Sequence, residues 1–370
     1  GERFIRPELR EQSAVNVFRV DTSLHRLQWN ENPYDFPADL KEEVLQRLAR
    51  VAWSRYPVGL RAFDTVDAIA EAWQLSSDQV AVGNGSSDML KVINNAILQT
   101  GDHVLTISPT FNSYVRHAES VGAIPHSIAL DPAQDFALPV ETILEQAAQY
   151  QPKLIIICAP NNPTGTVYPL DQLRRIVLES NAFVLLDAAY AEYVRRNDYE
   201  SGIELAATAD NVVMTRTFSK IYGLAGLRLG WGFGPAHVID AINRIRGPFN
   251  ISSPAIAAGV AALGDRGHVE RAVLHNETHL PRTSAALRGL GLEVTPSVGN
   301  FILIHLPGTP GRRAADADRF LLERGVVLRR MEAYGLPEAL RMTIGSEEAN
   351  AATVAAFRDF LAGPVAGPER

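Results

Sequence analysis

The stretch TFSKIYGLAGLRLGW, residues 217–231, places a single lysine, Lys220, among small and apolar residues. Lysine is rare in this chain, because only four of its 35 lysines and arginines are lysines. The other three, Lys41, Lys91 and Lys153, flank regular elements, where a solvated charge is the simple interpretation. Arginine stays protonated in proteins, whereas a desolvated lysine can lose its proton and act as an amine nucleophile. Lys220 is therefore a candidate nucleophile; the alternative is a side chain that extends to solvent from the edge of an element.

A second candidate for chemistry is the segment GNGSSDML, residues 83–90. Two glycines allow a tight turn, and Ser86 and Ser87 then open a helix whose free N–H groups could hold a phosphate. A plain helix cap is the alternative. A dinucleotide-binding fingerprint would need glycine at the sixth position, where this chain has Asp88, so that class of site is excluded.

A third candidate is Asp187, which ends the apolar run FVLLD. A carboxylate in such a place is costly to bury unless a cation lies beside it, and a protonated heterocycle would serve as that cation. Phe111 could lie flat on such a ring, although simple core packing is its other interpretation. Arg228 follows Lys220 after a glycine turn and could return to a phosphate. An amine, a carboxylate, an aromatic face and a phosphate site together fit pyridoxal phosphate.

The elements that must position these residues alternate between short apolar runs and amphipathic stretches, which is typical of an α/β domain with a largely parallel sheet. Polar, glycine or aromatic residues follow five of the apolar runs, and ligands of such sheets bind at the carboxyl ends of the strands. We therefore expect one shared ligand site. The expected strands are residues 79–82, 103–108, 153–158, 183–187, 211–215 and 228–233.

The division of the chain is expected to be threefold. Residues 1–55 form an N-terminal arm that also contributes to a small domain or to a partner subunit. Residues 56–262 form a large cofactor-binding domain, and residues 263–370 form a small α+β domain in which helical stretches precede NFILIHL and LRMTIG.

The bulk composition describes an ordinary globular protein, with 46% hydrophobic and 21% charged residues. A formal net charge of −7 without a basic run argues against nucleic-acid or anionic-membrane partners. The single cysteine, Cys158, excludes an internal disulfide framework and is expected to be an inert buried thiol. The nine histidines form no ligand motif, so we expect no metal site. No signal peptide or membrane span is evident, and a cytoplasmic enzyme is expected.

The motifs NNPTG, DAAYAEY, TFSKIYGLAGLRLGW and LRMTIG, in this order, resemble the fold-type-I pyridoxal-phosphate aminotransferases over nearly the whole chain. Within that superfamily, LQWNENPY, SRYPVG and GNGSSDML most resemble the histidinol-phosphate aminotransferases of the histidine pathway. The resemblance implies an α/β fold with a mostly parallel seven-stranded sheet, helices on both faces and a smaller α+β domain. It also implies pyridoxal 5'-phosphate as the cofactor.

The resemblance carries roles over to individual residues. Lys220 would bond to the cofactor aldehyde and shuttle the proton of the substrate α-carbon. Asp187 would pair with the pyridine nitrogen, Asn162 and Tyr190 would contact the ring hydroxyl, and Phe111 would stack on the ring. The phosphate ligands would be Ser86, Ser87, Thr217, Ser219 and Arg228.

Three further roles concern the substrate and a partner subunit. Arg341 would bind an anionic group of the substrate with the help of Arg329, and Asn32 would line the entrance. Tyr56 would reach the phosphate in the neighbouring subunit, so a homodimer is the expected unit.

The chain departs from the family pattern at three places. Ser87-Asp88 stands where Asp-Glu is usual, Phe111 stands where tyrosine is frequent, and Ala188 replaces the glutamate of DEAY. None of these changes affects Lys220.

The expected function is ping-pong transamination between histidinol phosphate, or imidazole-acetol phosphate, and glutamate or 2-oxoglutarate. Small-molecule amino and oxo compounds would be its only partners besides a second subunit. An aromatic aminotransferase or a decarboxylase of a phosphorylated amino acid on the same fold stays open, because pocket shape decides the substrate. A transcription regulator with an aminotransferase-like domain would need a DNA-binding module and a basic patch, and we expect neither from this sequence.

Overall fold

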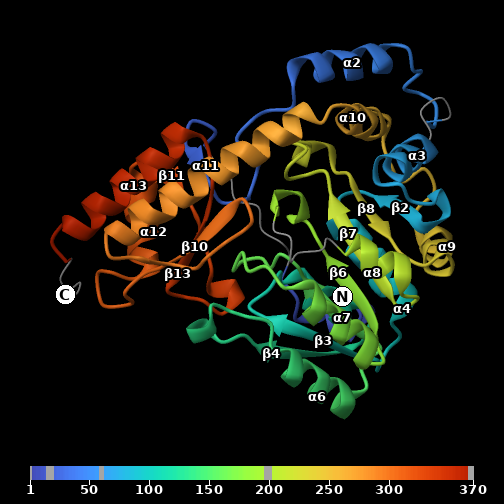
Figure 1. The fold of residues 1–370 in the computed structure, drawn as a ribbon, viewed down its shortest axis with the longest axis horizontal. Coiled ribbons are helices and arrows are strands. Elements are labelled where there is room, and N and C mark those ends of the chain that lie inside the picture. The colour runs from blue at the N-terminus through green and yellow to red at the C-terminus, as the bar shows by residue number, and fades with distance from the viewer. Residues whose placement is uncertain (1, 14–20, 58–61, 196–201, 366–370) are drawn as a thin grey trace.

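A seven-stranded sheet forms the centre of the larger part of the protein (Figure 1). The computed structural model describes residues 2–13, 21–57, 62–195 and 202–365. The strand order is β2-β8-β7-β6-β5-β3-β4; β8 runs antiparallel to both neighbours, and the remaining pairs are parallel. The predicted mostly parallel sheet is therefore confirmed. The strands are β2 Val80–Gly83, β3 His103–Ser108, β4 Ile124–Ala129, β5 Leu154–Cys158, β6 Phe183–Asp187, β7 Val212–Thr217 and β8 Gly230–Phe233.

The edge strand β4 was not among the strands expected from the sequence. Its residues, IPHSIA, include Pro125 and two polar side chains, so they do not form an apolar run. Proline is tolerated on an edge strand, where one side of the backbone has no ladder partner. β4 pairs only with β3, which explains why its pattern is weak.

Helices cover both faces of the sheet because alternate strand residues point to opposite sides. On β5, Leu154 and Ile156 pack in one apolar cluster and Ile155 and Ile157 in another. The first cluster includes side chains from α4 Ser86–Ile97, α5 Ser113–Ser120 and α9 Ala236–Ile245. The second includes side chains from α3 Ala62–Trp73, α6 Val140–Tyr150, α7 Leu170–Glu179, α8 Ile203–Thr208 and α10 Ser253–Gly264.

The smaller part is an α+β unit with its own apolar core, which includes Leu287, Ile302, Leu340 and Phe357 (Figure 1, orange to red). Its antiparallel sheet has the order β12-β13-β10-β9. Figure 1 shows α11 running from the end of α10 into this unit, alongside α13. The elements are α11 Gly267–Gly289, β9 Glu293–Val294, β10 Phe301–His305, α12 Ala314–Glu323, β11 Val326–Val327, β12 Arg329–Arg330, β13 Ala339–Thr343 and α13 Glu347–Ala362.

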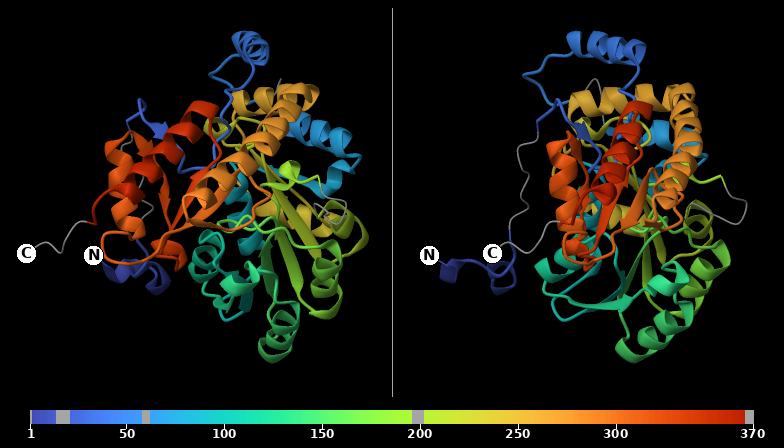
Figure 2. Two further views of the ribbon diagram at one scale, coloured as in Figure 1. Left: turned by 60° about the vertical axis from the view of Figure 1, so that its left-hand side comes forward. Right: turned by 90° about the vertical axis from the view of Figure 1, so that its left-hand side faces the viewer.

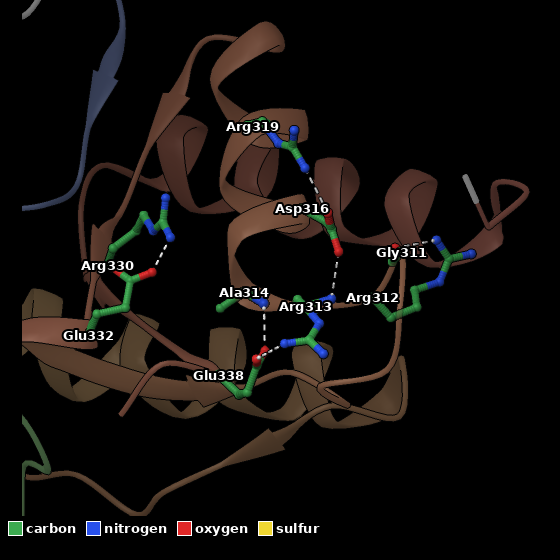
Figure 3. A network of polar contacts seen from close by, with 9 residues as sticks. All are labelled: Gly311, Arg312, Arg313, Ala314, Asp316, Arg319, Arg330, Glu332 and Glu338. Carbon is green, nitrogen blue, oxygen red and sulfur yellow. Dashed lines mark hydrogen bonds and ion pairs between the residues drawn. The ribbon is translucent and has the colours of Figure 1, made fainter. Parts of the chain in front are cut away.

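A polar network holds α12 against the segment that leads into β13 (Figure 3). Glu338 accepts hydrogen bonds from the backbone N–H of Ala314 (3.1 Å) and from the guanidinium of Arg313 (3.4 Å). Asp316 accepts one from the backbone N–H of Arg313 (3.0 Å). On β12, the side chain of Arg330 is paired with Glu332 outside this contact. The network therefore ties the start of α12 to Glu338, the residue before β13.

The N-terminal segment contacts both parts of the protein. The short strand β1 His25–Arg26 pairs in parallel with β11 of the small unit. Helix α2 Ala38–Ala49 instead packs against α10, at the top of Figures 1 and 2, and α1 Pro7–Arg10 lies near α5. Residues 14–20 of the expected arm lie outside the described residues. We keep the threefold division at residues 55 and 262 as a proposal, noting that α10 continues two residues beyond the second boundary.

None of the helices in the described ranges is both long and apolar enough to cross a membrane.

Candidate active site

A cavity of about 330 Å³ lies at the carboxyl edge of the large sheet, facing the small unit. Its walls come from the segments that follow β2, β3, β5, β6 and β7, as expected for a parallel sheet. The small unit adds Arg329, Tyr334 and Arg341. All of the site residues expected from the sequence line this cavity except Asn32 and Tyr56.

Lys220 projects into the cavity from the turn after β7. Its Nζ donates a hydrogen bond to the backbone carbonyl of Trp29 at 2.9 Å. Burial lowers the pKa of Lys220 to about 7; the charges of Arg341 and Arg228 act in the same direction, and Glu31 opposes them. A large fraction of the amine is therefore neutral near pH 7, which is the form that attacks an aldehyde. This geometry disfavours the alternative of a lysine that extends to bulk solvent.

The lowered pKa of Lys220 leads to a prediction for cofactor loading. The rate at which the apoprotein bonds pyridoxal phosphate should rise with pH and level off above about pH 7. The neutral amine, which increases as pH rises through its pKa, is the reactive species. Stopped-flow absorbance measures this rate, with a short lysine peptide as the control, whose rate should keep rising towards its pKa of about 10.4. A protein profile that follows the peptide would contradict the assignment.

Asp187 ends β6 with its carboxylate buried, only 3% exposed. Its Oδ2 accepts a hydrogen bond from the Tyr114 hydroxyl at 2.5 Å, and its Oδ1 accepts one from Thr215 Oγ1 at 3.0 Å. Burial raises the pKa of Asp187, and the two hydroxyl donors oppose that shift. Among the residues that the structure describes, no basic side chain forms an ion pair with Asp187. A protonated ring nitrogen in the cavity would supply the missing cation.

The turn between β2 and α4 forms a cradle for an anion. Gly85 has φ +82°, a left-handed conformation that favours glycine. Because glycine has no side chain, no side-chain cap occupies the N–H groups at the start of α4. On β8, a Cβ at Gly230 would collide with the backbone N of Ser86. The absence of both side chains lets the first N–H groups of α4 face the cavity, where the positive helix end favours a phosphate.

Basic and hydroxyl side chains complete this cradle. Arg228 Nη1 donates to Ser219 Oγ at 3.1 Å, and Thr217 Oγ1 accepts from the backbone N of Ser219 at 2.9 Å. A Cβ at Gly85 would collide with the guanidinium of Arg228, so this guanidinium lies directly over the turn. The set suits a phosphate dianion, and with Asp187 and Lys220 it fits pyridoxal phosphate.

The cradle predicts a specific effect of a single methyl group. Gly230→Ala should weaken pyridoxal phosphate binding by roughly ten- to a hundredfold, the scale of losing one or two hydrogen bonds to a charged group. The control is Gly232→Ala on the same strand, where the new methyl would meet the flexible end of Met89 at 3.1 Å. Titration of each apoprotein with the cofactor measures the effect. Equal affinity in the two variants would count against the phosphate site.

Asn162 and Tyr190 lie on the side of the cavity next to the small unit. Asn162 Oδ1 accepts from Arg341 Nη1 at 2.7 Å, and the Tyr190 hydroxyl accepts from Asn30 Nδ2 at 2.9 Å. Arg341 Nη2 also donates to the carbonyl of Gln28 at 2.8 Å, and the side chain is 5% exposed. Arg341 thus ties the two units together at the expected position of the cofactor ring.

Arg329 and Arg341 face each other directly across the antiparallel pair β12 and β13. Like charges at opposite positions of a sheet destabilise it, so an anion between them would offset the repulsion. The side chain of Arg329 has no hydrogen bond or ion pair within the described part of the chain and lines the cavity. The pair is suited to clamp a carboxylate or phosphate.

The two remaining expected residues lie elsewhere. Asn32 Nδ2 donates to the backbone carbonyl of Ile221 at 2.9 Å, next to Lys220, and does not line the cavity. Asn30, the first asparagine of the same WNENP motif, lines it together with Trp29 and Glu31. Of the two asparagines, Asn30 thus lies in the cavity wall, and the entrance role of Asn32 stays a prediction. Tyr56 is 70% exposed and stacks on Phe249, with ring centroids 4.4 Å apart.

Sequence reasoning missed several other neighbours of the site. Cys158 was expected to be inert, and it lines the cavity wall beside Asp187. Burial raises the pKa of its thiol to about 12, so it stays protonated and is not a nucleophile. Tyr114 is the last residue of the segment PTFNSY, residues 109–114, which follows β3. No role was expected for it from the sequence, but its hydroxyl donates a hydrogen bond to Asp187. Within the described ranges, no cluster of three or more His, Cys, Asp or Glu side chains could hold a metal ion.

The sequence of this chain is similar to those of known aminotransferases, which agrees with the composition of the site. The family model "Aminotransferase class I and II" matches residues 23–357. Histidinol-phosphate aminotransferase of Nitrobacter hamburgensis is 47% identical over 298 residues, which cover 80% of each chain. The enzyme of the same name from Nitrobacter winogradskyi is 43% identical over 343 residues, or 91% of each chain.

Solved structures share the fold. The crystal structure of histidinol-phosphate aminotransferase from Sinorhizobium meliloti, in complex with pyridoxal-5'-phosphate, superposes with a TM-score of 0.79 at 23% identity. The match covers 91% of this chain and 90% of that chain. At this identity the similarity establishes the fold alone.

Proposed function

Because the chain belongs to the class I and II aminotransferase family, we propose that it transfers an amino group between histidinol phosphate and 2-oxoglutarate. The products are imidazole-acetol phosphate and glutamate, and the reverse direction serves histidine biosynthesis. Relatives at 43–47% identity carry the name histidinol-phosphate aminotransferase. The main structural support for anionic substrates is the pair Arg329 and Arg341. The two guanidinium groups could bind either a carboxylate or a phosphate.

The enzyme is a pyridoxal-phosphate-dependent transaminase, and its own residues divide the work of holding the cofactor. When bound, pyridoxal phosphate supplies the aldehyde and the electron sink on which amino groups are exchanged. Lys220 Nζ would hold the cofactor covalently until the amino substrate displaces it. The freed amine would then move the proton of the substrate α-carbon, a task for which a pKa near 7 suits it.

The other side chains would fix the cofactor and tune its charge. Asp187 would stabilise the protonated ring nitrogen, and Asn162 and Tyr190 would contact the ring hydroxyl. Phe111 would cover one face of the ring. The phosphate would be held by the start of α4 and by Ser86, Ser87, Thr217, Ser219 and Arg228.

Arg329 and Arg341 would alternate between the carboxylate of glutamate and the phosphate of histidinol phosphate. Arg329→Gln should raise the KM for both substrates roughly ten- to a hundredfold and change kcat little, because it removes binding that ground state and transition state share. The matched control is Arg330→Gln, the next residue on β12, whose exposed side chain pairs with Glu332. Steady-state kinetics with each substrate measures KM and kcat for the two variants and the wild-type protein. A KM that stays at the wild-type value for both anions would remove Arg329 from the clamp.

We further propose a homodimer that acts in the cytoplasm. Tyr56 is exposed near Phe249, and Trp53 and Leu45 are 83% and 60% exposed. Exposed apolar side chains within residues 45–56 support burial against a second copy, where Tyr56 would reach the partner's phosphate site. A sedimentation experiment in which the purified protein remains a monomer at micromolar concentration would refute the dimer.

The substrate is tested by single-turnover spectroscopy of the cofactor-loaded protein. Histidinol phosphate, glutamate and phenylalanine are added separately, and conversion of the cofactor to its amine form is followed. We expect fast conversion by histidinol phosphate and by glutamate, with phenylalanine lagging. Conversion by phenylalanine but not by histidinol phosphate would identify an aromatic aminotransferase. Release of carbon dioxide from a phosphorylated amino acid would identify a decarboxylase.

A further inference from the structure

Tyr114 is a buried tyrosine that the reaction described above does not use. It lies in the first turn of α5, is 1% exposed, and donates its hydroxyl to Asp187 Oδ2 at 2.5 Å. We propose that Tyr114 is a positioning residue, whose hydroxyl orients the Asp187 carboxylate and keeps it anionic for the protonated ring nitrogen of the cofactor. This proposal deepens the proposed function and rests on its cofactor.

The two oxygens of Asp187 are held by two hydroxyls from different elements. Tyr114 on α5 binds Oδ2, and Thr215 on β7 binds Oδ1 at 3.0 Å. Thr215 lies beside Asp187 in the register of β6 and β7, whereas Tyr114 approaches from a helix on one face of the sheet. Hydrogen bonds to both oxygens restrict rotation of the carboxylate about its χ2 torsion. Its orientation is thereby set before a cofactor arrives, which is the usual benefit of a preorganised site.

The hydroxyl of Tyr114 is the donor in its hydrogen bond with Asp187. Burial and the neighbouring charge of Asp187 raise the pKa of Tyr114 well above its usual value of 10.0. The phenol therefore keeps its proton near neutral pH. A donor that always faces a carboxylate favours its ionised form. At Asp187 this effect opposes burial, which alone favours the neutral acid.

The ring of Tyr114 has a second contact that bears on the cofactor. It packs edge-to-face with Phe111, with centroids 5.5 Å apart and an interplanar angle of 84°. Phe111 lines the cavity and would cover one face of the cofactor ring. A Tyr114→Phe substitution keeps this ring contact and removes only the hydroxyl, so the two contributions can be separated.

The test uses two readouts on the whole protein that need no substrate. Tyr114→Phe should weaken pyridoxal phosphate binding to the apoprotein roughly tenfold, the scale of one hydrogen bond to a charged group. With ¹⁵N-labelled cofactor, the ring-nitrogen chemical shift of the loaded variant should move towards that of the unprotonated ring. A purely structural role would leave the ring-nitrogen shift unchanged.

The control is Tyr168→Phe. Tyr168 is also 1% exposed, and its hydroxyl has no hydrogen-bond partner within the described part of the chain. We expect wild-type cofactor affinity and a wild-type ring-nitrogen shift for this variant. The proposal is overturned if Tyr114→Phe keeps the wild-type ring-nitrogen chemical shift. It is also overturned if Tyr168→Phe changes the cofactor affinity and the ring-nitrogen chemical shift as much as Tyr114→Phe does. A wild-type protein that fails to convert histidinol phosphate would refute only the substrate, because neither readout depends on it.

Discussion

Lys220→Ala should reduce the rate of amino transfer at least about a thousandfold. The variant loses the amine that would bond to the cofactor and the base that would move the substrate proton, and general acid–base catalysis alone contributes roughly 10²–10⁴ in rate. The other three lysines, Lys41, Lys91 and Lys153, do not line the cavity and cannot replace it. Single-turnover absorbance with glutamate as the amino donor measures the loss.

The matched control for this prediction is Lys153→Ala. Lys153 precedes β5, its side chain is about half exposed, and it pairs with Asp102 at 3.4 Å. An exposed pair of this kind contributes only about 0–1 kcal/mol to stability, so both folding and activity should be preserved. If Lys220→Ala retained more than a tenth of the wild-type rate while Lys153→Ala behaved normally, Lys220 would not be the catalytic amine.

Asp187→Asn should weaken cofactor binding and amino transfer by roughly a hundredfold or more. Truncating one partner of a buried hydrogen-bonded charge pair costs about 2–5 kcal/mol, because the other charge is left without its counterion. The amide has nearly the same shape, but it cannot stabilise a protonated ring nitrogen. It would also turn N–H donors towards Tyr114 or Thr215, both of which donate to the carboxylate. Cofactor titration and single-turnover rates measure the two effects.

A second acidic residue provides the comparison for Asp187→Asn. Asp318 on α12 is partly buried, and burial also raises the pKa of its carboxyl, but it lies in the small unit and does not line the cavity. Asp318→Asn should therefore leave the cofactor affinity unchanged. Wild-type affinity in Asp187→Asn would show that the ring nitrogen does not depend on this carboxylate.

The sequence predicted those parts of the site whose signal is local. Lys220 stood out because lysine is rare and its neighbours are apolar, and Asp187 because it ends an apolar strand. Since the carboxyl ends of parallel strands share an edge, the strand pattern by itself indicates that these two side chains lie close together. The same reasoning placed Ser86 at a helix start that faces the cavity.

The features that escaped prediction depend on contacts between distant segments. Tyr114 and Asp187 are 73 positions apart, and nothing in PTFNSY indicates that its last residue faces a carboxylate. The opposition of Arg329 and Arg341 depends on the register of β12 and β13. Asn30 and Asn32 are the same residue type two positions apart, and their spacing does not show that Asn30 is the one that lines the cavity.

The most direct measurement is to locate the lysine that bonds to the cofactor. The loaded protein would be reduced with borohydride, which makes the bond permanent, then digested and analysed by mass spectrometry. The chain has only Lys41, Lys91, Lys153 and Lys220, so each possible site gives a distinct peptide. We expect a pyridoxyl group on Lys220 in stoichiometric yield and none on the other three. A label on another lysine, or no stable label, would contradict the assignment of Lys220 and the chemistry derived from it.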